Sequence, residues 1–277
     1  MARFESLNQY SEFADFVKRK ARYVLDARNR HFLDAVIETS TRRKRTIERG
    51  TKLWRAQKDC LFERESIRDD DDNEIDFIET PVPHPPDRML PLADRAWEGR
   101  VNPKGIPCLY LAVDMNTAMA EVQPWIGSYV SVATFVMLRD LNVVDCSAIG
   151  KLDARKLDLL GGFSEPTPSE LEEWVWESIS RAFSQPVTRA DDVADYAPTR
   201  VLAEAFRSAG HDGIVYGSKL GKGNNVAVFD LGAAELSSRH VFQVESVDLK
   251  FSCKANPTFA GSGPDEDQNS EDYPPGY

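Results

Sequence analysis

Six residues that could do chemistry stand at the ends of predicted strands or on the helix that follows one. They are Arg55, Arg100, Tyr110, Glu121, Ser218 and Asn225. Arginine guanidinium groups bind phosphate oxygens in pairs, and a tyrosine ring packs against another planar ring. A carboxylate can stabilise an oxocarbenium-like centre on a ribose. Together these residue types suit a nucleotide that carries a diphosphate.

Each of these residues also has an ordinary structural interpretation. Arg55 could form a surface ion pair, and Tyr110 could be a core aromatic residue. Glu121 could be an exposed acid on a helix, and Ser218 a residue that forms a turn. Spacing alone leaves both interpretations open, because clusters of this kind mark functional sites only statistically.

Other classes of site find less support. The four histidines are not spaced as a metal-binding pair, so we expect no metal and disfavour a histidine-dependent hydrolase. The four cysteines lie far apart without a C-x-x-C pair, which disfavours a zinc knuckle and a disulfide framework. No G-x-G-x-x-G follows a predicted strand and no G-x-x-x-x-G-K-[ST] occurs, so Rossmann and P-loop enzymes are disfavoured.

Two helices are predicted in the first 50 residues. Apolar residues at helical spacing predict one helix over 7–25, and Phe32 to Ile37 continue the pattern in a second helix that runs into the basic cluster Arg42–Arg45. The apolar stripes must cover either the main domain or a second subunit. The basic cluster is interpreted as a solvated helix end in preference to a binding patch.

After Thr51 the sequence changes to short apolar runs separated by turns. Strands are predicted from Leu53, over Ile106–Val113, Tyr129–Leu138, Leu141–Asp145, Ile214–Tyr216, Val226–Phe229 and Val241–Phe251. Helices are predicted over Ala118–Gln123, after Ser169 in a capping-box-like S-E-L-E, and over Val201–Ser208. The strands outnumber the helices and follow one another through turns or single helices. This pattern favours an α+β fold with a largely antiparallel sheet.

Two segments are predicted to lie outside the regular structure. Residues 64–88 contain Asp69–Asp72 and a run of prolines, and we expect an exposed acidic loop there. Residues 253–277 are expected to be a disordered acidic tail, since from residue 255 they carry five acids, four prolines and no basic residue.

The charge is unevenly distributed along the 277 residues. Residues 1–50 hold 12 Lys/Arg against 7 Asp/Glu, a net charge of +5, and the remaining residues hold 22 against 38, a net charge of −16. An acidic body repels phosphates, so direct binding of nucleic acid is disfavoured. No stretch approaches a membrane span and no signal peptide opens the sequence, so we expect a cytoplasmic protein without membrane contact.

Several blocks of the sequence resemble the RES domain family, in family order over about residues 50–230. They are Gly50–Ala56, Gly99–Ala112, Thr117–Val122, Asp212–Ser218 and Asn224–Phe229. The family is named after an arginine, a glutamate and a serine, which correspond here to Arg55, Glu121 and Ser218. The resemblance implies an ADP-ribosyltransferase-like fold with mostly antiparallel split sheets and flanking helices. It divides the chain into an N-terminal helical extension (1–50), a RES-like catalytic domain (51–252) and the tail (253–277).

The resemblance also implies an activity and partners. Family members are toxins of bacterial toxin–antitoxin pairs that consume NAD+ by hydrolysis or phosphorolysis, and the usual partner is a helix-turn-helix antitoxin that plugs the active site. NAD+ would be the substrate, with no resident cofactor. On this reading Arg55 and Arg100 hold the diphosphate and Tyr110 packs against the nicotinamide end. Glu121 stabilises the ribose cation, and Ser218 and Asn225 hydrogen-bond the ribose or the nicotinamide amide.

Two other functions stay open at this point. One is transfer of ADP-ribose to a protein, for which the acidic segment 64–88 could supply part of an acceptor surface. The other is a catalytically inactive module whose N-terminal helices dock a partner. The sequence leaves open the acceptor and any homo-oligomer formed through residues 1–50.

Overall fold

The computed structural model describes residues 2–92, 96–147, 166–185 and 193–248. The chain falls into two compact units, Met1–Glu245 and Ser246–Tyr277. Every helix and strand that is described belongs to the first unit. The predicted tail, 253–277, lies outside the described residues. No helix in the described part of the chain has the length and apolar character needed to cross a membrane.

The first unit mixes helices and strands, as the sequence predicts. Its helices are α1 (Gln9–Arg19), α2 (Ala27–Ser40), α3 (Pro86–Met89), α4 (Met115–Glu121), α6 (Pro168–Ser184) and α7 (Ala197–Ser208), with short 3-10 turns η1 (Thr41–Arg43), η2 (Val193–Tyr196) and η3 (Leu231–Ala233). Its strands are β1 (Lys44–Ile47), β2 (Lys52–Lys58), β3 (Leu61–Arg68), β4 (Glu74–Val82), β5 (Leu109–Ala112), β6 (Tyr129–Met137), β7 (Leu141–Cys146), β8 (Gly213–Gly217), β9 (Asn224–Val228) and β10 (Ala234–Gln243).

Eight strands form one sheet in the order β1-β7-β8-β9-β5-β2-β6-β10. In the described chain only the β7–β8 pair is parallel, so the sheet is largely antiparallel as predicted. The expected division into split sheets is not found, because β2 and β5 are joined within one sheet, although by a single residue pair, Trp54↔Ala112. Two well-paired halves therefore meet at a junction where few backbone groups are hydrogen-bonded across.

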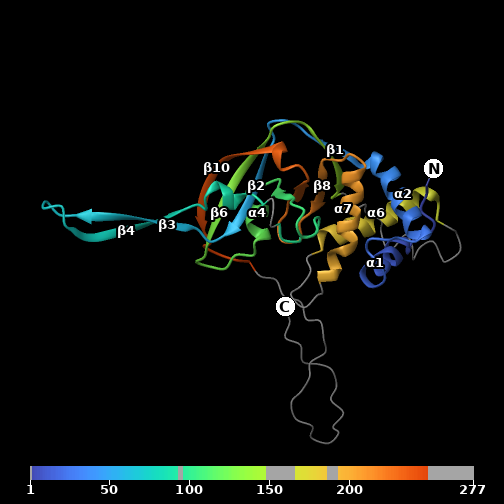
Figure 1. Ribbon diagram of the computed structural model, residues 1–277, viewed down its shortest axis with the longest axis horizontal. Coiled ribbons are helices and arrows are strands. Elements are labelled where there is room, and N and C mark those ends of the chain that lie inside the picture. Colours follow the sequence, from blue (N-terminus) through green and yellow to red (C-terminus); the bar gives the residue numbers. More distant parts are fainter. Residues whose placement is uncertain (1, 93–95, 148–165, 186–192, 249–277) are drawn as a thin grey trace, which may run out of the picture. The chain divides into compact units, whose positions relative to one another are not determined.

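The two faces of the sheet are covered by separate apolar clusters. Side chains alternate across a strand, so on β7 Val144 joins one cluster while Val143 joins the other. The first cluster combines β7 and β8 with α1, α2, α6 and α7, which gather at that end of the sheet in Figure 1. The second cluster contains apolar residues of β2, β5, β6 and β9. The helices α1, α2, α6 and α7 therefore cover one face of the sheet at its β7–β8 end. The short helix α4 packs against β2 and β5, next to the β5–β2 junction.

The first 50 residues belong to this same core. Phe13 and Phe32 are buried with ring centroids 4.8 Å apart, in the cluster that also holds Trp176 and Phe206. Trp176 Nε1 donates to Thr39 Oγ1 at 2.9 Å, which ties α6 to α2. The apolar stripes predicted in this segment therefore cover the main sheet of their own chain.

Several boundaries differ from the sequence prediction. The first helix ends at Arg19, not Leu25, so Val24 is exposed. The second helix stops before the basic cluster, whose residues occupy η1 and the edge strand β1. The cap of α6 is Thr167 in a true capping box with Glu170, in place of Ser169. The last strand, β10, is an edge strand as predicted but begins at Ala234 and ends at Gln243.

The predicted acidic loop 64–88 is wrong in its secondary structure. Residues 61–82 form the antiparallel hairpin β3–β4, which extends away from the main sheet in Figure 1, with Asp69–Asp72 at its turn. Alternating apolar residues such as Phe62 and Phe77 supply strand character that the charged residues between them mask in the sequence. The hairpin is exposed along almost its whole length, as expected for the loop.

Candidate active site

The candidate site is centred on Glu121, the last residue of α4. Asp114 caps this helix, since its side chain accepts hydrogen bonds from Thr117 N at 2.8 Å and from Thr117 Oγ1 at 2.7 Å. The helix is only seven residues long, so the cap fixes where Glu121 comes to lie. The carboxylate stands at the C-terminal end of the helix dipole, which disfavours negative charge unless other groups donate to it.

Two donors converge on one oxygen of that carboxylate. Ser218 Oγ donates to Glu121 Oε1 at 2.6 Å, and Asn225 Nδ2 donates to the same oxygen at 2.6 Å. The second oxygen, Oε2, makes no hydrogen bond to any residue within the described ranges. One carboxylate oxygen is therefore held in place, while the other is left to interact with a ligand.

The glycine-rich loop between β8 and β9 brings Ser218 to this position. A Cβ on Gly223 would lie 2.0 Å from Asp114 Oδ2, and one on Gly221 would lie 2.7 Å from Thr117 Oγ1. Gly223 N donates to Thr117 Oγ1 at 2.9 Å. Only glycine permits the loop to lie this close to the start of α4. The close packing explains the irregular glycine spacing, which fits no phosphate-binding motif.

The two predicted arginines come from β2 and from the loop that precedes β5. Arg55 on β2 donates through Nη1 to Tyr110 O at 3.4 Å, and burial lowers the pKa of its guanidinium. Burial also opposes the charge on Arg100, but the nearby Tyr216, Tyr196 and Glu121 raise the pKa of this arginine overall. The Nε atoms of both arginines are buried without a hydrogen-bond partner.

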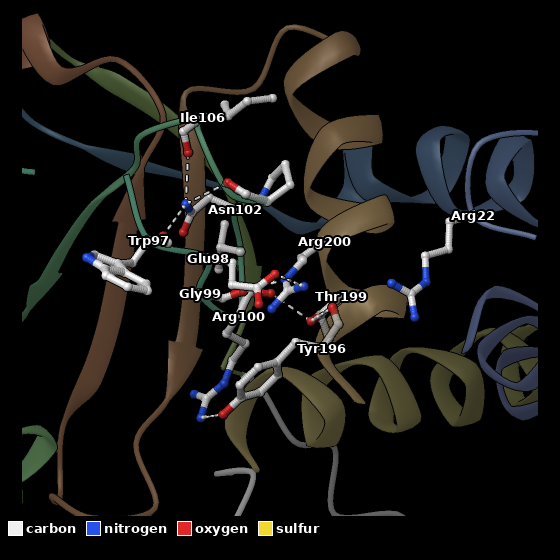
Figure 2. A network of polar contacts seen from close by, with 12 residues as sticks. Arg22, Trp97, Glu98, Gly99, Arg100, Asn102, Ile106, Tyr196, Thr199 and Arg200 are labelled. Carbon is white, nitrogen blue, oxygen red and sulfur yellow. Dashed lines mark hydrogen bonds and ion pairs between the residues drawn. The ribbon is translucent and has the colours of Figure 1, made fainter. Parts of the chain in front are cut away.

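Tyr110 organises the loop that carries Arg100. Its hydroxyl donates to Asn102 Oδ1 at 2.7 Å and accepts from Val101 N at 2.9 Å. A Cβ on Gly99 would lie 2.4 Å from this hydroxyl, so the loop can close on Tyr110 only with glycine there. Asn102 Nδ2 in turn donates to the carbonyl oxygens of Trp97, Pro103 and Ile106, as Figure 2 shows. The hydroxyl of Tyr110 is thus committed to the protein, and only its ring is available to a ligand.

These residues enclose a cavity of about 360 Å³ at the β5–β2 junction. Five of the six predicted residues line it, namely Arg55, Arg100, Tyr110, Glu121 and Asn225. Ser218 does not line the cavity and reaches it through its hydrogen bond to Glu121. A second cavity of about 630 Å³ shares Arg55, Gly99 and Tyr110 with the first. The two hollows are therefore neighbours that share part of their lining.

A larger hollow lies elsewhere and contains none of the predicted residues. It has a volume of about 770 Å³ and is lined by the N-terminal segment, the basic cluster and the start of α6. Two of its cations are engaged already. Arg42 pairs with Glu172, and Arg43 lies over the ring of Trp176. The convergence of polar groups favours the smaller cavity as the candidate site.

The structure adds aromatic residues to the site that the sequence analysis missed. Tyr196, Tyr216 and Trp54 also line the 360 Å³ cavity. The guanidinium of Arg100 lies 5.4 Å from the ring centroid of Tyr196 and 5.3 Å from that of Tyr216. Burial raises the pKa of the Tyr216 hydroxyl, so this group stays protonated. Trp54 and Tyr216 were inside family-like blocks, whereas no local signal marks Tyr196.

The histidines take structural roles where their contacts are described. His84 Nε2 contacts Lys58 O at 2.9 Å, and His211 Nε2 contacts Ser40 Oγ at 3.0 Å. Across the described ranges, no group of three or more His, Cys, Asp or Glu residues could hold a metal ion. The candidate site itself offers a carboxylate, an amide and guanidinium groups that line the cavity, with the Ser218 hydroxyl bonded to the carboxylate.

Comparisons with known proteins bear on the fold and the family. The sequence model of the RES domain matches residues 78–252, a range that contains every predicted site residue except Arg55. No curated protein matches the chain. Among solved structures, the chain is similar to the M. tuberculosis MbcT–MbcA toxin–antitoxin complex. The TM-score is 0.38 at 15% identity, over 75% of this chain and 92% of that chain.

Proposed function

The chain belongs to the RES domain family, and on that premise we propose that it is a toxin-type enzyme that degrades NAD+. The observation that carries the proposal is the pair of 2.6 Å hydrogen bonds that hold Glu121 Oε1 beside Arg55 and Arg100 in one cavity. A single oriented carboxylate next to two cationic side chains matches a ribose cation next to a diphosphate.

In the proposed reaction the bond between ribose C1′ and the nicotinamide nitrogen breaks. The bonding electron pair goes to nicotinamide, which leaves as a neutral molecule from a cationic pyridinium, so little acid catalysis is needed. Glu121 stabilises the positive charge that develops on the ribose, through the oxygen that Ser218 and Asn225 leave open. Water or phosphate then forms a bond to C1′ and releases a proton to solvent. The products are nicotinamide and either ADP-ribose or its phosphate ester.

The arginines would bind the diphosphate. Arg55 and Arg100 both line the 360 Å³ cavity, and phosphate oxygens would bind the guanidinium nitrogens that face it. The Tyr110 ring, whose hydroxyl is already engaged, would pack against the nicotinamide end. NAD+ acts here as the substrate, and we propose no further cofactor.

The proposal predicts the consequences for the cell and for partners. Loss of NAD+ would arrest growth, so a cell that makes this protein would need an inhibitor. We propose that the inhibitor is a helix-turn-helix antitoxin that occupies the cavity at the β5–β2 junction, and that both proteins act in the cytoplasm.

The test is NAD+ loss and nicotinamide release by the purified protein, with and without phosphate. Glu121→Gln should lower turnover by about 100-fold or more, because the charge that stabilises the ribose cation is lost. Glu204→Gln is the matched control, since Glu204 is an exposed glutamate on α7, outside the cavity. Full turnover in Glu121→Gln would refute the assignment. Transfer of ADP-ribose to added protein without free ADP-ribose would point instead to an ADP-ribosyltransferase, and binding without turnover to an inactive module.

A further inference from the structure

The short segment that carries Arg100 is fastened to the start of α7, as Figure 2 shows. Arg200 Nε donates to Gly99 O at 2.7 Å, just before Arg100 in the chain. Thr199 Oγ1 donates to the carbonyl oxygen of Arg100 itself at 2.7 Å. The backbone is therefore held by hydrogen bonds at Arg100 and at the residue before it.

Thr199 and Arg200 thus form a clamp on the backbone at Arg100. The side chain of Arg200 is buried and paired. The side chain of Arg200 is 10% exposed, and its Nη1 lies 2.9 Å from Glu98 Oε2. The Nε and Nη1 donors of Arg200 thus bind one carbonyl oxygen and one carboxylate of the same segment. A buried charge pair costs desolvation energy, so it contributes little net stability but fixes one geometry when its hydrogen bonds are satisfied. Here the fixed geometry is that of the segment that carries Arg100.

The side chain of Arg100 is fixed as well as its backbone. Its guanidinium is near the rings of Tyr196 and Tyr216, and Nη2 donates to the Tyr196 hydroxyl at 3.4 Å. A free arginine loses considerable rotamer entropy when it binds a ligand. Contact with the two rings already restricts the rotamers of Arg100, so less rotamer entropy is lost when the ligand binds.

The first 50 residues brace the same region. Lys18 on α1 forms an ion pair with Asp195 at 2.7 Å, next to Tyr196 in the chain. Phe13 and Val17 of α1 lie in the apolar cluster that contains Phe206 of α7. The N-terminal helices therefore hold α7, and α7 holds the segment of Arg100.

We propose that Arg200 and Thr199 are positioning residues that preorganise Arg100 for the diphosphate of the substrate, with α1 as their support. Neither residue lines the 360 Å³ cavity, so each would act through Arg100. The inference rests on the proposed function for the identity of the ligand. The clamp itself is a property of the protein without ligand.

The binding test uses ADP and adenosine as probes, measured by calorimetry on the full chain. Arg200→Met and Thr199→Val should each weaken ADP binding by roughly tenfold or less, while adenosine binding stays unchanged, because only ADP carries the diphosphate. Arg207→Met is the matched control, since Arg207 is an exposed arginine on the same helix and contacts Pro107 O and Phe229 O instead. An equal loss in Arg207→Met would overturn the inference.

A double-mutant cycle with Arg100→Ala separates positioning from general loosening. If Arg200 acts through Arg100, Arg200→Met should have no further effect on ADP binding once Arg100 is gone. Additive losses would overturn the inference. Where Arg200→Met fails to fold, the near-isosteric Thr199→Val serves in the same cycle and decides it.

A measurement without ligand distinguishes failure of the clamp from failure of the proposed function. The Arg100 Nε–H should exchange slowly with water in the intact protein, followed by NMR of ¹⁵N-labelled arginine, because this atom is buried. Exchange should speed up by roughly tenfold or more in Arg200→Met and not in Arg207→Met. Faster exchange without any binding of ADP or NAD+ by the intact protein would refute the proposed function alone. Unchanged exchange would refute the clamp.

Discussion

A carboxylate at the end of a helix is the central chemical feature of this protein. Glu121 is the last residue of α4, and the C-terminal end of a helix dipole is unfavourable for a negative charge because backbone carbonyl groups face it. Ser218 and Asn225 offset this by donating to one oxygen, and Ser218 Oγ itself accepts from Gly221 N at 2.8 Å. The residue is thus ordered by strong local hydrogen bonds, as a group that must meet a developing charge requires.

A second residue, His211, gives a pH dependence of stability. It is buried, and burial lowers the pKa of its imidazole below the ordinary 6.5, with Lys44 acting in the same direction and Asp212 against it. The unfolded chain therefore binds this proton at higher pH than the folded chain does. The free energy of unfolding should be full above pH 6.5 and should fall as the pH drops from 6.5 towards the lowered pKa.

Urea unfolding at about pH 5 and about pH 7.5 tests this expectation. The difference in unfolding free energy between the intact chain and His211→Gln should be smaller at the lower pH, because the intact chain loses stability there. The same comparison with the exposed His240→Gln should show no such change. A difference that stays constant with pH in His211→Gln would contradict the assignment.

At the scale of elements, the β8–β9 loop and α4 form one unit. Gly223→Ala should disturb it, because the new Cβ would lie 2.0 Å from Asp114 Oδ2 and would displace the cap of α4. Loss of the cap costs about 1 kcal/mol, and the shift of Ser218 should lower NAD+ turnover by roughly tenfold or more.

Thermal unfolding and turnover measure the two effects separately. Lys222→Ala in the same loop is the control, since Lys222 is exposed and should tolerate the change. Wild-type turnover in Gly223→Ala would show that the loop can leave α4 without consequence for Glu121.

The β3–β4 hairpin is an element that the core does not need. Its side chains from Leu61 to Pro81 are exposed or nearly so, and it is paired only with itself. A two-stranded hairpin alone is marginally stable in water. Replacement of residues 63–80 by Asn-Gly should therefore leave the midpoint of thermal unfolding within about 2–4 °C of the intact chain. A larger fall by calorimetry would mean that the hairpin supports the sheet.

At the scale of the whole molecule, the N-terminal helices and the sheet share one core. Phe13 is fully buried, and Phe13→Ala should cost about 3–5 kcal/mol in the free energy of unfolding. Tyr23→Ala is the matched aromatic control, because Tyr23 is 97% exposed and should change stability by no more than about 0.5 kcal/mol. Equal costs in urea unfolding would mean that residues 1–50 fold apart from the rest.

Much of the fold could be predicted from the sequence because its signals are local. Tyr129–Leu138 is β-branched and aromatic, and it forms β6 at Tyr129–Met137 as predicted. The hairpin was missed because charged residues stand among its apolar residues and almost its whole length is exposed, so that composition indicated a loop. The cap of α6 lies at Thr167 and not at the predicted Ser169, since the side chains of both residues can accept a hydrogen bond from a backbone N–H.

The sequence by itself determined the residue types, seven of the eight strands of the main sheet, and the RES family to which the chain belongs. It could not determine that the sheet is joined at Trp54↔Ala112, that Tyr196 stacks beside Arg100, or that Arg200 is fastened to Glu98. These contacts join residues about 60 to 100 positions apart, and no local pattern encodes them. Only the tertiary structure decided them, because side chains from distant segments meet where the packing of helices on a sheet brings their backbones together.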